Sequence, residues 1–121
     1  MSLRAQARAW LHRRGRQSLG ALYTSKYYVA EQSWTGAEAW WIQIPLKRLG
    51  SESSIDAVCE SKPDSTEFRH LRIPTAFLRK RLADLAVVGD STISLFLSAE
   101  PKSLFVDKRG RGRVDFRQFE Q

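Results

Sequence analysis

The 121-residue chain has a single cysteine, Cys59, and no apolar run long enough to cross a bilayer. An internal disulfide is therefore excluded, and a zinc site would have only His12 and His70 to add to that cysteine. No glycine-rich phosphate loop of the dinucleotide or P-loop kind is present. These absences predict a protein of a reducing compartment, the cytoplasm, with no membrane partner, no cofactor and no resident metal.

Acidic residues are missing from residues 1–30, although the whole chain has 13 Asp and Glu against 20 Lys and Arg and a net charge of +7. Residues 1–22 have the Arg-rich, acid-free composition of a mitochondrial presequence, which would predict import. The favoured interpretation is an amphipathic helix over about Leu3–Arg14, because Leu3, Ala7, Trp10 and Leu11 share one face.

The length predicts one domain, with a basic N-terminal helix and loop at 1–22 and an α+β core at 23–121. Apolar, β-branched and aromatic segments predict strands at 23–29, 39–44, 55–60, 68–73 and 93–98, and a helix at 75–85 lies between the last two. The segments 104–106 and 114–119 predict a final hairpin, or a strand with a docked tail. We expect a mostly antiparallel sheet of four to six strands with 93–98 at its centre and two helices packed on one face.

The pairs Ile44-Pro45 and Ile73-Pro74 lie at or just after the ends of two predicted strands. Each leads through a basic segment with leucine and a glycine turn into a further strand. The pattern is consistent with an old duplication of a strand–helix–strand unit, and chance explains it equally well.

Two further basic clusters favour nucleic acid as the partner, because clustered cations attract polyanions. A predicted helix carries the first cluster on the side away from its leucines, and a glycine-containing turn carries the second, where arginines could grip phosphates. The candidate nucleic-acid-binding residues are Arg79, Lys80, Arg81, Lys108, Arg109, Arg111 and Arg113. A solvated surface helix and a solvated turn are the alternatives.

Aromatic residues are concentrated between residues 27 and 41, where Tyr27, Tyr28, Trp34, Trp40 and Trp41 occur. Neighbouring residues on a strand point to opposite faces, so Trp40 and Trp41 cannot both enter one core. An outward ring could stack on a base or contact a protein partner. The favoured interpretation is that a second layer, such as the N-terminal helix with Trp10, covers it.

An acidic segment at 51–67 contains Glu60-Ser61-Lys62 at the end of a predicted strand, with Asp56 on the same strand face as Glu60. Two carboxylates and an ammonium group in this arrangement can hold Mg²⁺ and an attacking water. The pattern resembles the signature of restriction-endonuclease-like nucleases. In that family the metal-binding Asp comes from the preceding strand, and Glu38 is the nearest residue in that position here.

Three functions follow as hypotheses. The first is a small, non-enzymatic domain that binds DNA, RNA or a nucleoprotein complex mainly through phosphates. The second is a Mg²⁺-dependent nuclease with Asp56, Glu60 and Lys62 as its catalytic residues. The third is an interaction module whose exposed tryptophan surface binds another protein or a second copy of the chain, giving a homodimer.

Overall fold

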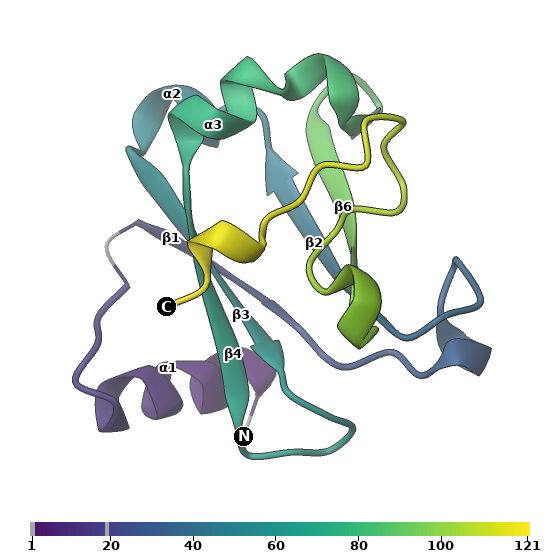
Figure 1. The fold of residues 1–121 in the computed structure, drawn as a ribbon. Helices are drawn as coiled ribbons and strands as arrows, with labels where there is room; N and C mark the ends of the chain where they lie inside the picture. The colour runs from purple at the N-terminus through teal and green to yellow at the C-terminus, as the bar shows by residue number, and fades with distance from the viewer. Residues whose placement is uncertain (1, 19) are drawn as a thin grey trace.

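Two three-stranded sheets form the framework of this α+β domain in the computed structural model, which describes residues 2–18 and 20–121 (Figure 1). The first sheet has the order β1 (Ala21–Ser25), β3 (Ser54–Glu60) and β4 (Phe68–Pro74). The second sheet has the order β2 (Ala39–Pro45), β6 (Thr92–Ser98) and β5 (Ala86–Val88). Every pair of neighbouring strands is antiparallel except β1 and β3, which are parallel.

The expected single sheet is therefore corrected to two sheets, whereas the α+β class and the strand count are confirmed. Strand β6 lies at the centre of its sheet, as its nearly continuous apolar sequence predicted. The predicted strand at 23–29 begins and ends earlier, at Ala21–Ser25, and β5 was not predicted. The expected final hairpin is reduced to isolated bridges, among them one between Val106 and Asp115.

Helix α1 (Leu3–Arg13) forms where the sequence predicted a helix. The Ser2 side chain accepts a hydrogen bond from the N–H of Ala5 at 3.1 Å and caps its first turn. Gly15 follows the helix with a φ of +68°, a left-handed conformation that glycine adopts without strain. The predicted N-terminal segment 1–22 also contains residues 1 and 19, which lie outside the described residues.

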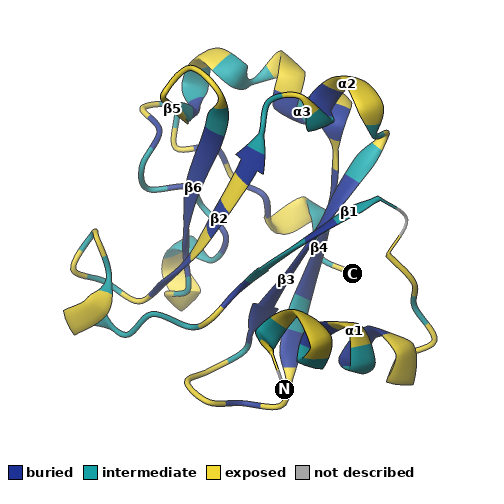
Figure 2. Cartoon of the chain, turned by 180° about the vertical axis from the view of Figure 1, so that it is seen from behind, coloured by how far each residue is buried: buried dark blue, intermediate teal, exposed yellow. Residues whose placement is uncertain are grey.

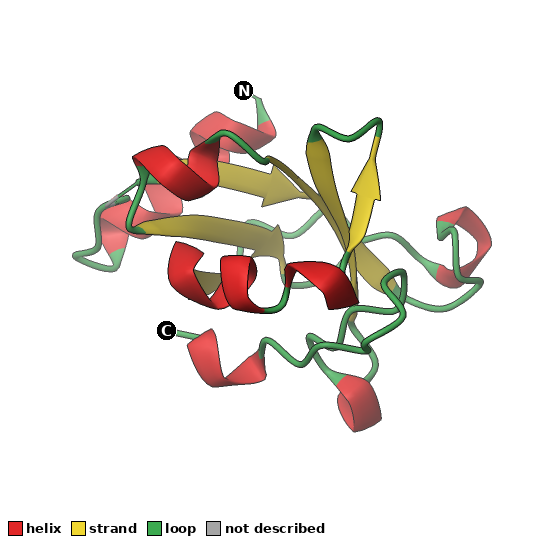
Figure 3. Cartoon of the chain, turned by 90° about the horizontal axis from the view of Figure 1, so that it is seen from above, coloured by secondary structure: helices red, strands yellow, loops and turns green. Residues whose placement is uncertain are grey.

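Helix α1 and helix α3 (Thr75–Lys80) do not cover one face of a sheet together, contrary to the expected two-helix layer (Figure 3). Helix α1 packs Ala7, Trp10 and Leu11 on the first sheet. Helix α3 lies beside α2 (Arg48–Ser51) at the end of the domain where the chain passes between the sheets (Figure 1). The predicted helix at 75–85 is shorter than expected, because it ends at Lys80 and a 3-10 turn, Leu82–Asp84, follows.

The main core lies between the inner faces of the two sheets, whose strands are largely buried (Figure 2). Its largest fully buried side chains include Trp40, Phe105 and Phe116, and the rings of Trp40 and Phe105 stack with centroids 5.0 Å apart. The C-terminal segment thus closes the core although it forms no regular strand. No helix among residues 2–18 and 20–121 has the length and apolarity that a membrane span requires.

The two sheets correspond to each other through their Ile-Pro pairs. Ile44 of β2 lies opposite Ile93 of β6, and Ile73 of β4 lies opposite Ile55 of β3. The two antiparallel ladders match pair for pair along their whole length, from Ala39↔Ser98 and Phe68↔Glu60 at one end to Pro45↔Thr92 and Pro74↔Ser54 at the other. The residues of the sequence pattern therefore occupy corresponding positions in the two ladders.

The corners that follow the two prolines also correspond. The N–H of Leu46 donates to the carbonyl of Ser91 at 2.8 Å, and the N–H of Thr75 donates to the carbonyl of Ser53 at 3.0 Å. Ser91 directly precedes β6, which pairs with β2, and Ser53 directly precedes β3, which pairs with β4. A short helix then buries a leucine four residues after its proline, namely Leu49 in α2 and Leu78 in α3.

We expect Ile44→Ala and Ile73→Ala to lower the free energy of unfolding by similar amounts, about 2–5 kcal/mol each. Both side chains are fully buried at equivalent positions, so each substitution removes apolar contacts and leaves a cavity. Urea unfolding followed by circular dichroism measures the change, with the exposed Val87→Ala on β5 as the control. A loss below about 1 kcal/mol at either isoleucine would contradict the proposed equivalence.

Candidate nucleic-acid interface

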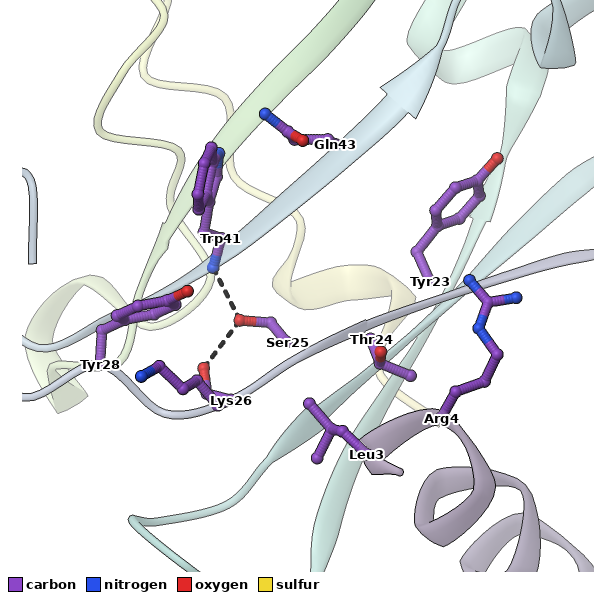
Figure 4. Close-up of a pocket in the computed structure, with 9 residues that line it drawn as sticks. All are labelled: Leu3, Arg4, Tyr23, Thr24, Ser25, Lys26, Tyr28, Trp41 and Gln43. Carbon is purple, nitrogen blue, oxygen red and sulfur yellow. Dashed lines mark hydrogen bonds between the residues drawn. The ribbon is translucent and has the colours of Figure 1, made fainter. Parts of the chain in front are cut away.

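A polar pocket opens where the edge strands β1 and β2 diverge (Figure 4). Two contacts join the chain at the end of β1 to β2. Tyr28, just after β1, forms a backbone bridge with Ala39, and the Ser25 hydroxyl accepts from the N–H of Trp41 at 2.9 Å. Beyond this junction the pocket has a volume of about 440 Å³. Its lining residues are Leu3, Arg4, Tyr23, Thr24, Ser25, Lys26, Tyr28, Trp41 and Gln43.

An aromatic pocket lies beside it, on the outer face of the second sheet. The rings of Trp41 and Phe96 stack across β2 and β6 with centroids 5.7 Å apart, and Trp34 is tilted against Phe96 at 5.4 Å. Trp34 is 64% exposed and Trp41 is 36% exposed, so their apolar surface is available to a partner. The pocket has a volume of about 410 Å³, and Arg109 lies among the residues that line it.

Arg109 reaches the aromatic pocket because Asp107 holds its backbone on β6. The buried Asp107 carboxylate accepts from the N–H groups of Phe96, Arg109 and Gly110 at 3.0–3.1 Å. The Arg109 guanidinium then lies over the rings of Trp34 and Phe96, 5.5 and 5.8 Å from their centroids. It also donates to Ser94 Oγ at 2.8 Å, an atom that accepts from the indole N–H of Trp41 at 2.9 Å.

The two pockets form one surface, because Tyr28 and Trp41 line both of them. We call this surface the aromatic–basic groove and define it by Arg4, Tyr23, Lys26, Tyr28, Trp34, Trp41, Phe96 and Arg109. The ammonium group of Lys26 lies 4.9 Å from the centre of the Tyr28 ring, and Arg4 extends beside Tyr23 (Figure 4). None of the described residues that line the two pockets carries a carboxylate, so the groove is positively charged.

The cluster predicted on the helix at 75–85 lies outside this groove. Arg79 donates to the carbonyl of Leu49 and, at 3.3 Å, to Thr75 Oγ1, so it joins α3 to α2. Arg81 pairs with Asp84 at 2.8 Å. Lys80 is exposed and lines neither pocket. Two of the three charges are therefore used in local structure.

The second predicted cluster is divided by the fold. The loop at residues 108–113 packs against the rest of the domain. The N–H of Gly112 donates to the Asp84 carbonyl at 3.0 Å, and a Cβ at Gly112 would overlap the Asp84 side chain. Lys108 and Arg113 line a separate pocket that also contains Glu38 and Glu100. Arg111 is exposed, and of this cluster the structure brings Arg109 alone to the groove.

The three candidate nuclease residues are not brought together. The buried Asp56 carboxylate accepts from His70 Nε2 at 2.6 Å and from Arg72 Nε at 2.9 Å. Glu60 lies about 13 Å further along the same face of β3, at about 3.3 Å per residue, and its carboxylate accepts from the N–H of Tyr27 at 2.9 Å. Lys62 is exposed. In the described part of the chain, no three His, Cys, Asp or Glu side chains are grouped as metal ligands.

The prediction that Trp40 and Trp41 point to opposite faces is confirmed, since Trp40 is buried and Trp41 is partly exposed. The expectation that Trp10 and the N-terminal helix cover the outward ring is wrong. Trp10 packs against Phe68 of the first sheet, and its indole N–H donates to Glu67 at 3.0 Å. The concentration of aromatic residues in the sequence signalled this surface, but no sequence signal placed Arg4, Lys26 or Phe96 beside it.

No protein-family model, curated protein or solved structure matches this chain. The function is therefore argued from the groove and its chemistry.

The Asp56 network makes the stability of the fold sensitive to acid. Burial by itself raises the pKa of the Asp56 carboxyl, but the hydrogen bonds and charges of His70 and Arg72 outweigh burial and lower that pKa. Because this pKa is lower in the folded state than in the unfolded chain, the ionised Asp56 carboxylate stabilises the fold. Its contribution to the free energy of unfolding is fully present above the ordinary carboxyl pKa of about 4. It is lost as the pH falls below about 4 through the lowered value.

We expect Asp56→Asn to destabilise the protein at neutral pH and to remove this acid-sensitive contribution. The difference in free energy of unfolding between the wild type and the variant should shrink as the pH falls below about 4. Urea unfolding from pH 7 to pH 2.5 measures it, with the exposed Asp90→Asn as the control. A difference that stays constant over this range would show that the charge of Asp56 contributes nothing.

Proposed function

We propose that this protein binds nucleic acid through the aromatic–basic groove. The observation that carries the proposal is the position of Arg109, whose guanidinium lies over the exposed ring of Trp34 and the buried ring of Phe96 in a surface without carboxylates. Arg4 and Lys26 line the adjoining pocket and extend the positive surface along β1. A phosphate backbone supplies the complementary charge, and bases supply flat surfaces for the rings.

The net charge of +7 supports the same proposal through long-range attraction. Contacts to phosphates position a nucleic acid without reading its sequence, so we infer modest sequence specificity. The nuclease alternative has less support, because His70 and Arg72 occupy the Asp56 carboxylate and Glu60 lies far along the strand. The interaction-module alternative uses the same tryptophans, and the experiment below separates it from the proposal.

The charges of the groove are tested by removing two of them. We expect the double variant Arg4→Gln, Lys26→Gln to bind a short oligonucleotide about tenfold more weakly at 50 mM salt, because each lost phosphate contact weakens binding most at low salt. The slope of log affinity against log salt concentration should also decrease in magnitude by about 1.4–1.8. Fluorescence anisotropy at several salt concentrations measures both quantities.

The matched control is the double variant Lys62→Gln, Lys80→Gln, which removes the same charge from two exposed side chains outside the groove. We expect it to retain nearly wild-type affinity and slope. Equal losses in the two double variants would mean that net charge alone causes binding. If the wild type fails to bind at 50 mM salt, the proposal is wrong and the tryptophan surface is left for a protein partner.

A further inference from the structure

Contacts within the protein hold both tryptophans in the aromatic half of the groove. The indole N–H of Trp41 is fixed by Ser94 Oγ. Trp34 lies in a turn closed by hydrogen bonds between the side chains and backbone of Ser33 and Thr35, and Gly36 follows with a φ of +75°. The Trp34 ring itself contacts Phe96 and Arg109, and the two tryptophans keep 64% and 36% of their surface exposed. Preorganised rings lose little conformational freedom when a flat partner stacks on them.

The outer face of the second sheet, which carries Trp41, corresponds to the face of the first sheet that α1 covers, but no helix in the described part of the chain covers it. The ladder places Trp41 and Phe96 at the positions that His70 and Val58 occupy in the first sheet. On the first sheet, α1 packs over this face, and Val58 is fully buried beneath it. On the second sheet no helix of the described residues packs over the corresponding rings. Trp34 and Arg109 lie over Phe96, which is 6% exposed, whereas β2 keeps an exposed segment (Figure 2).

The chemistry of the open face favours an anionic ligand with flat rings over a packed helix. Helix α1 meets an apolar surface of Leu22, Val58 and Phe68 on the first sheet. The face of the second sheet instead combines protruding rings with the Arg109 guanidinium and the cations of the adjoining pocket. Among nucleic acids, a duplex keeps the faces of its bases stacked inside, whereas a single strand offers them to aromatic side chains.

We infer that the groove selects single-stranded nucleic acid, with unpaired bases stacked on Trp34 and Trp41. The sugar–phosphate backbone of the nucleic acid then follows the adjoining pocket, where Arg4 and Lys26 contact its phosphates. Arg109 lies between the stacked bases and this backbone. This inference rests on the proposed function and adds the strand state of the ligand. It assigns affinity to the phosphates and strand selectivity to the two tryptophans.

The test uses three labelled probes of equal length and labelling, compared by fluorescence anisotropy with the wild-type protein at 50 mM salt. The probes are a single-stranded oligothymidine, a duplex of the same length, and a single-stranded oligonucleotide whose bases have been removed. We expect the single strand to bind at least about tenfold more tightly than the base-free strand, which keeps the phosphates but offers no rings to stack. The duplex should also bind more weakly than the single strand despite its higher charge.

Two tryptophan variants then assign the selectivity to the groove. We expect Trp34→Ala and Trp41→Ala each to weaken single-strand binding about 5- to 150-fold and to leave base-free-strand binding almost unchanged. Trp34→Phe should retain most of the affinity, because it keeps a ring. The control Val88→Ala removes exposed apolar surface on β5 outside both pockets, and circular dichroism verifies that each variant is folded.

Equal binding of the single strand and the base-free strand would overturn this inference and leave the proposed phosphate binding intact. Tighter binding of the duplex than of the single strand would also overturn it. A tryptophan variant that is folded and loses affinity equally for all three probes would contradict a stacking role. The absence of binding to every probe would instead overturn the proposed function itself.

Discussion

The two corners at Pro45 and Pro74 are the constraint on which the rest of the structure depends. At each corner the residue after the proline donates its N–H to a serine carbonyl, which ends one strand beside the start of its partner. Proline cannot donate to a ladder, so it is suited to the point where pairing stops. The chain then crosses to the other sheet, and Leu49 or Leu78 closes that end of the core.

The corners also determine which side chains share a face. Because the two ladders match pair for pair, the face that carries Asp56 and His70 in one sheet carries Ser94 and Trp41 in the other. In the first sheet these positions bind each other and are covered, and Arg72 compensates the charge of Asp56. In the second sheet Ser94 also binds Trp41, but the Trp41 ring stays partly exposed. One architecture therefore supplies both a closed structural face and an open candidate binding face.

The sequence predicted those parts of the fold that depend on local patterns. Alternation within 39–44 identified β2 and the opposite directions of Trp40 and Trp41, and the apolar run at 93–98 identified a central strand. The division into two sheets was not predictable, because alternation within a strand does not specify its partner. Arg109 could be grouped with its basic neighbours, but its place on the rings depends on Asp107 and β6 in three dimensions.

Clustered charge in the sequence was a weaker guide to the candidate site than the surroundings of each cation. Many arginines are paired with carboxylates, namely Arg14, Arg48, Arg69, Arg72, Arg81 and Arg117. Such pairs cancel much of the field that a basic run suggests, even where each contributes little to stability. Within the described residues, no carboxylate forms an ion pair with Arg4, Lys26 or Arg109, and each lines a pocket with aromatic rings. The candidate groove is therefore marked by a few cations beside aromatic rings that form no ion pair with a described carboxylate, and not by the net charge alone.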